Sequence, residues 1–205
     1  MIAVILPSRG LIHSRTIECV LENLTETARG YDLYFSHDLS IPECFNTPIE
    51  RALKGKNSKF YSYIWFVEED MYFDKYTLSR MIEMDRAVVS CDYADKKTGK
   101  GFAYFHNGEV VFTGMGCFLI RREVLKKLKE PYFKKVLAEI QEDGSLKLRA
   151  GGAKNQYGTH DVYFCLSLSK AGFKINLTKA KVAHLRLDSD INKRNGFFKV
   201  TPVYL

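Results

Sequence analysis

The chain has 205 residues, of which 46% are hydrophobic and 13% aromatic, so it is long and apolar enough for one globular domain and is not a disordered chain. Lys and Arg outnumber Asp and Glu by 31 to 24, and the resulting net charge of +7 favours anionic partners such as phosphates, although it also serves solubility. The five cysteines form no CxxC pair and the basic residues are scattered, which excludes a zinc ribbon and a basic nucleic-acid-binding tail.

The first half of the chain alternates apolar runs with helical periodicity. Residues 2–6 are a continuous aliphatic run, as expected for a strand buried on both faces of a parallel sheet. After that strand, the pattern predicts a helix from Ser14 to about Gly30 and a strand over 31–35. A second predicted helix begins with the capping box Thr47-Pro48-Ile49-Glu50. A strand over 60–67, a helix over about 76–85 and a strand over 87–91 follow.

The second half adds antiparallel signals to this alternation. Asn107-Gly108 between two apolar runs predicts a hairpin, and Asp143-Gly144 predicts a second turn. The remaining predictions are a strand over 117–120, a helix over 122–129, a helix from Thr159 to Lys170, and strands over 173–177 and 181–185. We therefore expect an α/β fold with a mostly parallel central sheet, helices on both faces and a small antiparallel insertion.

Ligands of open parallel sheets bind beyond the carboxyl ends of the strands, which draws attention to the acidic run Glu68-Glu69-Asp70 after a buried strand. Side chains of a strand alternate, so Glu68 and Asp70 face the same way. Two carboxylates on one side suit Mg²⁺ or Mn²⁺, hard cations that share oxygen ligands with substrate phosphates. A polar strand end or a helix cap is the alternative interpretation of this run.

Two further residues are candidates for chemistry. Asp161 lies in the first turn of a predicted helix, where it would act as a general base at the rim of a cleft or simply interact with the helix dipole. His184 lies at the end of a late strand, where it would be a metal ligand or a buried structural residue. The chain contains no Walker loop, GxGxxG or HExxH motif, so the common ATP, dinucleotide and zinc-protease sites are not indicated.

Several segments, in order, resemble glycosyltransferases of the GT-A type, and most of all the inverting group that includes the family 2 enzymes. The similar segments are residues 2–9 (first strand and donor loop), 44–53 (an Asn-containing helix), 64–71 (strand and DxD motif), 114–125 (acceptor-side strand and helix) and 158–165 (the "ED" segment). Here Glu68 replaces the first Asp of the DxD motif, and His160 replaces the acid before Asp161. The resemblance covers residues 1–185, with residues 186–205 expected to be a tail that packs on the same domain.

The resemblance implies a metal-dependent glycosyltransferase that moves a sugar from a nucleotide-diphosphate sugar to an acceptor hydroxyl with inversion. Asp161 would be the catalytic base. The ligands of Mn²⁺ or Mg²⁺ would be Glu68, Asp70 and His184, and the donor would be surrounded by Pro7, Ser8, Arg9, Asp38, Asn46 and Glu69. The acceptor would be a glycan, a protein or a lipid.

Two other functions stay open at this point. A sugar-phosphate nucleotidyltransferase also combines a parallel sheet, Mg²⁺ and a nucleotide, but its first loop is usually rich in glycine and basic residues, and here only Arg9 and Gly10 fit. The interpretation as a non-enzymatic nucleic-acid-binding protein would rest on the net charge of +7.

The sequence also predicts a location. Unpaired cysteines, the lack of a signal peptide and the lack of any long apolar run predict a cytoplasmic protein without a transmembrane segment, in the host cytoplasm if viral. The compact single-domain members it resembles include some that viruses encode.

Overall fold

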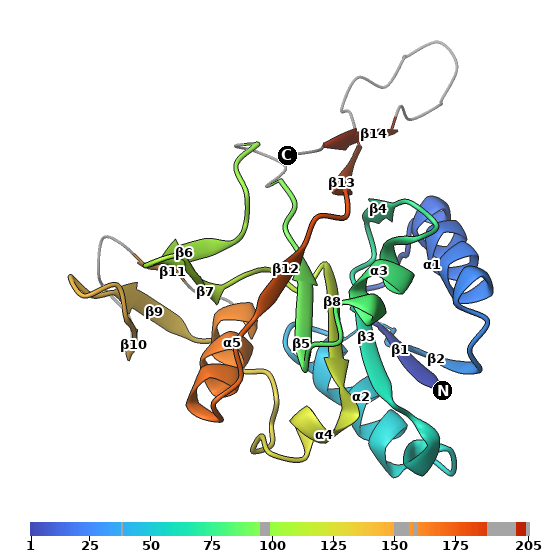
Figure 1. Cartoon of the computed structure of the whole chain (residues 1–205), viewed down its shortest axis with the longest axis horizontal. Helices are drawn as coiled ribbons and strands as arrows, with labels where there is room; N and C mark the ends of the chain where they lie inside the picture. The colour runs from blue at the N-terminus through green and yellow to red at the C-terminus, as the bar shows by residue number, and fades with distance from the viewer. Residues whose placement is uncertain (38, 95–98, 150–155, 158–159, 188–199, 204–205) are drawn as a thin grey trace.

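The computed structural model describes residues 1–37, 39–94, 99–149, 156–157, 160–187 and 200–203 (Figure 1). Its centre is a six-stranded sheet with the order β12-β5-β8-β3-β1-β2. The strands are β1 (Ile2–Leu6), β2 (Tyr31–Phe35), β3 (Tyr63–Val67), β5 (Val88–Cys91), β8 (Cys117–Arg121) and β12 (Asn176–Thr178). Only β8 runs antiparallel to its neighbours, which are β3 and β5. The other three pairings of this sheet are parallel, namely β1 with β2, β1 with β3 and β12 with β5.

Helices cover both faces of this sheet, because its strands are apolar on both sides. The helices are α1 (Ser14–Thr27), α2 (Glu43–Lys54), α3 (Thr77–Glu83), α4 (Arg122–Leu125) and α5 (His160–Lys170), with a short 3₁₀ helix over Ser58–Phe60. One core packs Val4 and Trp65 of the sheet against Leu24 of α1 and the apolar side of α3. The other packs Phe66 against α2 and against Phe164 of α5.

Three small sheets surround the central one. They are formed by β6 (Tyr104–His106) with β7 (Glu109–Phe112), by β9 (Leu137–Ile140) with β10 (Leu146–Arg149) and β11 (Gln156–Tyr157), and by β4 (Met71–Phe73) with β13 (Val182–Leu187) and β14 (Val200–Val203). Asn107 and Gly108 turn the β6–β7 hairpin with φ of 50° and 77°, the left-handed conformation that this dipeptide favours. The predicted α/β architecture, with a mostly parallel sheet and small antiparallel additions, is confirmed.

Some predicted boundaries are wrong. The helix expected to begin at the Thr47-Pro48 capping box begins at Glu43, and Pro48 lies inside it. The reason is tertiary: Cys44 and Phe45 are buried, so packing of that turn against the core extends the helix beyond the local cap signal. The helix expected over 122–129 ends at Leu125, and β4 and β14 were not predicted.

This arrangement gathers the candidate residues at one end of the central strands. The carboxyl ends of β1, β2 and β3 lie there together with the start of β8, since the Ser36 backbone N–H donates to the Leu6 carbonyl and the Glu68 N–H donates to the Gly116 carbonyl. Pairing of β4 with the first half of β13 brings residues 182–184 to the same end of the sheet (Figure 1). Within the described residues, no helix has the length and apolar character needed to span a membrane.

Candidate functional site

Glu68, Asp70 and His184 converge at this end of the central strands. One potential ligand atom from each of them lies within 4.8 Å of the others. Glu68 follows directly after β3, whereas His184 reaches the site because β13 pairs with β4 in a register that sets His184 opposite Met71. A hydrogen bond of 2.7 Å from the Leu185 N–H to the Asp70 carbonyl continues this pairing. Residues separated by more than 100 positions in the sequence thus form one group of two carboxylates and an imidazole.

The orientation of His184 suits metal ligation. Its side chain is buried at 6% exposure, and its Nδ1 lies 2.8 Å from the Ala94 carbonyl. Because a carbonyl can only accept, Nδ1 donates, and Nε2 then carries the lone pair that ligation uses. The rings of Tyr93 and Phe102 pack edge-on against the imidazole, with centroids 4.7 and 5.6 Å away. These contacts hold the ring in one orientation.

The electrostatics of Glu68 favour a cation. Burial raises the pKa of the Glu68 carboxyl well above its usual range, and the nearby carboxylates of Asp161, Asp70 and Glu69 raise it further. Arg9 opposes this effect only in part. Negative charges are therefore held close together with insufficient positive charge around them, and a divalent ion would supply it.

Asp161 also lies close to Glu68. It belongs to the first turn of α5, and one oxygen of its carboxylate comes within 4.8 Å of both Glu68 and His160. His160 Nε2 is 2.7 Å from Asp161 Oδ1. The structure therefore places the residue predicted to be the base near the predicted metal ligand Glu68, which belongs to both groups.

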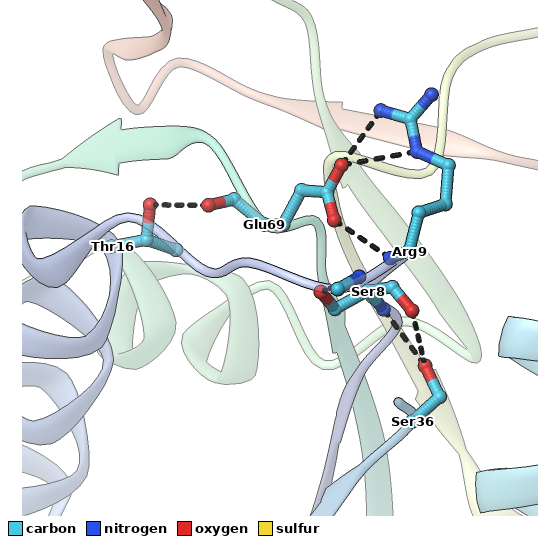
Figure 2. A network of polar contacts seen from close by, with 6 residues as sticks. Ser8, Arg9, Thr16, Ser36 and Glu69 are labelled. Carbon is cyan, nitrogen blue, oxygen red and sulfur yellow. Dashed lines mark hydrogen bonds and ion pairs between the residues drawn. The ribbon is translucent and has the colours of Figure 1, made fainter. Parts of the chain in front are cut away.

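The loop after β1 is fixed by an ion pair and by two serines (Figure 2). Glu69 accepts hydrogen bonds from the Arg9 backbone N–H at 2.9 Å and from its guanidinium at 2.6 and 3.1 Å. Ser36 Oγ accepts from the Ser8 N–H at 2.8 Å and donates to the Ser8 carbonyl, while Thr16 donates to the carbonyl of Glu69. Glu69 belongs to neither group of potential metal ligands, and its carboxylate holds Arg9 in place.

A cavity of about 290 Å³ joins these residues. Its walls are formed by Pro7, Ser8, Arg9, Ile41, Cys44, Phe45, Glu68, Glu69, Asp70, Phe102 and His184. The lining combines acidic groups with apolar side chains. Burial and the charges of Glu68 and Glu69 raise the pKa of the Cys44 thiol to about 11, so this cysteine stays neutral in the cavity. Such a mixture of convergent polar groups and apolar surface is typical of small-ligand sites.

Two residues predicted to contact the donor, Asn46 and Asp38, are not among the described residues that line the cavity. Both polar atoms of the Asn46 amide bind the backbone of Phe133, with Nδ2 donating to its carbonyl at 2.9 Å and Oδ1 accepting from its N–H at 3.0 Å. Asn46 therefore connects α2 to the segment after α4 and is not among the residues that line the cavity. Asp38 lies outside the described residues.

The sequence interpretation missed several residues of the site. Phe45 and Cys44 directly precede Asn46 and were noticed only as part of a motif, and Phe102 only as part of the apolar run before the predicted hairpin. Tyr93 lies in a stretch without a recognisable pattern. Tyr93 is fully buried, contacts the His184 ring and accepts a hydrogen bond from Gly116. Its position becomes visible only when β5, β8 and β13 are brought together.

Comparison with solved structures finds chains of the same fold. A197 from STIV matches with a TM-score of 0.58 and 20% identity over 98% of this chain and 93% of that one. The catalytic domain of Drosophila β1,4-galactosyltransferase 7 in complex with xylobiose matches with a TM-score of 0.50 and 14% identity, over 87% of this chain and 64% of that one. A mutant of that enzyme in complex with manganese, UDP-Gal and xylobiose gives 0.52 and 13%, over 97% and 75%.

No family model and no curated protein sequence matches the chain. At identities of 13 to 20%, the structural likeness shows the fold and nothing finer. This chain has a fold of the GT-A type.

Proposed function

We propose that the protein is a metal-dependent glycosyltransferase that transfers a sugar from a nucleotide-diphosphate sugar to an acceptor hydroxyl with inversion. The observation that carries this proposal is the convergence of Glu68, Asp70 and His184 in a cavity that also contains the Ser8–Arg9 loop, with Asp161 beside them. The likeness to a galactosyltransferase crystallised with manganese and UDP-Gal supports the same kind of ligand.

The donor side of the site fits a divalent ion. Two carboxylates and an imidazole are ligands that Mn²⁺ accepts, and the Nδ1 bond to Ala94 directs His184 Nε2 to act as one of them. A divalent ion held there would offset the negative charge of a nucleoside diphosphate as it leaves the sugar. Arg9, fixed by Glu69 at the wall of the cavity, would add positive charge near the donor phosphates.

The acceptor side is assigned to Asp161. A carboxylate near the anomeric carbon would accept the proton of the attacking hydroxyl, and a single displacement from the face opposite the leaving group inverts the configuration. Its proximity to Glu68 is consistent with a reaction centre that lies between the base and the metal ligands. Burial against Phe45 and Phe133 holds the adjacent His160, and with it the first turn of α5, in place.

The proposal is tested by thermal unfolding with UDP, GDP, CDP, ADP or dTDP, each with and without Mn²⁺. A nucleotide at roughly 100 times its Kd stabilises the folded state by about 2.7 kcal/mol, which corresponds to a shift of several degrees for a chain of this size. We expect one nucleotide to give that shift, and only with metal. Asp70→Asn should remove the shift, and Asp161→Asn should preserve it while abolishing transfer.

Asp143→Asn is the matched control, because Asp143 lies on the β9–β10 turn, outside both groups of potential metal ligands, and its Oδ1 accepts a hydrogen bond from the Ser145 N–H. If no nucleotide shifts the unfolding temperature at any metal concentration, the proposal is wrong. Pyrophosphate release from a sugar phosphate and a nucleoside triphosphate would instead indicate a nucleotidyltransferase. Salt-sensitive binding of polynucleotides without a nucleotide response would indicate a nucleic-acid-binding protein.

A further inference from the structure

The acidic end of the central strands contains a second convergent group besides the one assigned to the donor ion. Potential ligand atoms of Glu68, His160 and Asp161 also lie within 4.8 Å of one another. Glu68 is common to both groups, whereas His160 and Asp161 do not line the 290 Å³ cavity. The second group therefore shares Glu68 with the donor cavity, and its other two members lie outside the cavity lining.

His160 is an unusual residue in this position. Its side chain is only 5% exposed and it packs against the rings of Phe45 and Phe133, with centroids 4.4 and 5.8 Å away. Neither ring nitrogen makes a hydrogen bond within the described part of the chain, and neither does Asp161 Oδ1. Buried polar atoms without a partner are costly, so their presence together indicates a missing ligand.

Two of these unpaired atoms lie close together. His160 Nε2 and Asp161 Oδ1 are 2.7 Å apart but lack the alignment of a hydrogen bond. Two ligands of one zinc ion, each about 2.0–2.2 Å from it, are roughly 3–3.5 Å apart, so the two atoms need to separate only slightly to share an ion. Glu68 would supply the third ligand, and the set of one imidazole and two carboxylates leaves one position of a tetrahedral ion open.

We propose that Glu68, His160 and Asp161 form a second divalent-cation site, suited to zinc, which shares Glu68 with the donor-ion site and, when filled, stops Asp161 from acting as a base. Imidazole and carboxylate ligands bind Zn²⁺ more tightly than Mn²⁺, so zinc is the ion that we expect to fill this second site. Manganese in the donor site supports transfer, and zinc in the second site inhibits it. The inhibition rests on the proposed function, but the binding of the ion does not.

The first experiment counts ions and does not require activity. Metal-free protein is dialysed to equilibrium against Zn²⁺, and the bound zinc per chain is measured by elemental analysis. We expect two ions in the unsubstituted chain and one in His160→Phe, which keeps an aromatic ring between Phe45 and Phe133 but has no ligand atom. The double variant Asp70→Asn/His184→Phe should also bind one ion, and the combination of all three substitutions should bind none.

His37→Phe is the matched control, since His37 is an exposed histidine outside both groups, and it should still bind two ions. Circular dichroism and thermal unfolding establish that each variant is folded, and His160→Gln replaces His160→Phe if the latter is not. One ion in the unsubstituted chain, or two in His160→Phe, would overturn the second site.

The second experiment uses the transfer reaction at saturating Mn²⁺. Zinc should inhibit the unsubstituted enzyme, and His160→Phe should raise the zinc concentration for half-inhibition, relative to its own zinc-free rate, by tenfold or more. Two bound ions without zinc inhibition would preserve the site but overturn the blocking of Asp161. Failure of the proposed function itself would appear as an absence of transfer, with the ion count unchanged.

Discussion

The hydroxyl of Tyr93 accepts a hydrogen bond from the Gly116 N–H at 2.8 Å, and the Gly116 carbonyl accepts one from the Glu68 N–H at 3.1 Å. The same tyrosine ring packs against His184. A side chain at position 116 would not fit, because its Cβ would lie 2.7 Å from both Tyr93 Cζ and Met71 Sδ. Tyr93 and Gly116 thus position two of the three proposed donor-ion ligands through direct contacts.

Tyr93→Phe should destabilise the protein and weaken manganese binding together. Removing the hydroxyl leaves the buried Gly116 N–H without its acceptor, which costs about 1–3 kcal/mol. The position of Glu68 then becomes less well defined, so the affinity for Mn²⁺ should fall as well. Urea denaturation and titration calorimetry measure the two effects. Tyr31→Phe, at a tyrosine that is 41% exposed, is the control and should change stability by less than about 0.5 kcal/mol. Unchanged stability in Tyr93→Phe would contradict this role.

Asn46→Ala should lower stability without changing the nucleotide affinity of the folded protein. The amide makes two hydrogen bonds to the Phe133 backbone, and their loss leaves a buried donor and acceptor unpaired at about 1–3 kcal/mol. The resemblance predicted instead that Asn46 contacts the donor. Urea denaturation together with nucleotide titration distinguishes these roles, because a donor contact would lower the affinity even where the protein is fully folded.

The architecture could be predicted because its signals are local. The run over residues 2–6 is apolar at every position and becomes a central strand, and Asn107-Gly108 can adopt the positive φ angles that the hairpin needs. The acidic run was also visible, since Glu68 and Asp70 directly follow the buried strand β3. Local periodicity and turn chemistry therefore identified most elements and the end of the central strands at which the site lies.

The features of the fold and the site that the sequence did not predict depend on contacts between distant segments. The start of α2 at Glu43 follows from the burial of Phe45 against Phe133, which competes successfully with the capping box at Thr47. The functions of Tyr93 and Asn46 depend on partners 23 and 87 positions away. His160 matched no histidine motif, and the rings that pack against it belong to α2 and to the segment after α4. No local pattern encodes such contacts.

Asp32→Asn should lower stability at neutral pH and have little effect in strong acid. The Tyr61 hydroxyl donates to Asp32 Oδ2, Asn57 donates to the same oxygen at 2.9 Å, and these bonds lower the pKa of the Asp32 carboxyl below its usual value of 3.8. The folded state therefore prefers the ionised form. Its contribution is present above pH 3.8 and is lost as the pH falls through the lowered folded-state pKa. After allowance for solvent screening, we expect about 1 kcal/mol.

Urea denaturation of both proteins at pH 7 and at a pH below the folded-state pKa measures this difference. Glu83→Gln, on the exposed surface of α3, is the control for the loss of one carboxylate. A gap between Asp32→Asn and the unsubstituted protein that is equal at both pH values would show that the two hydrogen bonds do not depend on the charge of Asp32.

Glu68→Gln and Glu69→Gln should have opposite patterns, although they are the same substitution at adjacent positions. Glu68 belongs to both convergent groups, so its amide variant should lose most of its affinity for Mn²⁺. Glu69 instead accepts three hydrogen bonds from Arg9. Its variant should bind Mn²⁺ as before but respond more weakly to the nucleotide, because the loop after β1 and the Arg9 guanidinium are less firmly held.

The measurement is Mn²⁺ titration of each variant, followed by nucleotide titration at saturating Mn²⁺. In the metal-free protein at neutral pH, Glu68→Gln should also be more stable than Glu69→Gln. It removes a carboxylate whose ionised form is disfavoured by burial and by neighbouring acids. Equal loss of Mn²⁺ affinity in both variants would mean that the acidic run acts as one diffuse negative patch. Loss confined to Glu68→Gln would show that the two adjacent acids have separate roles, with Glu68 as a metal ligand and Glu69 as the partner of Arg9.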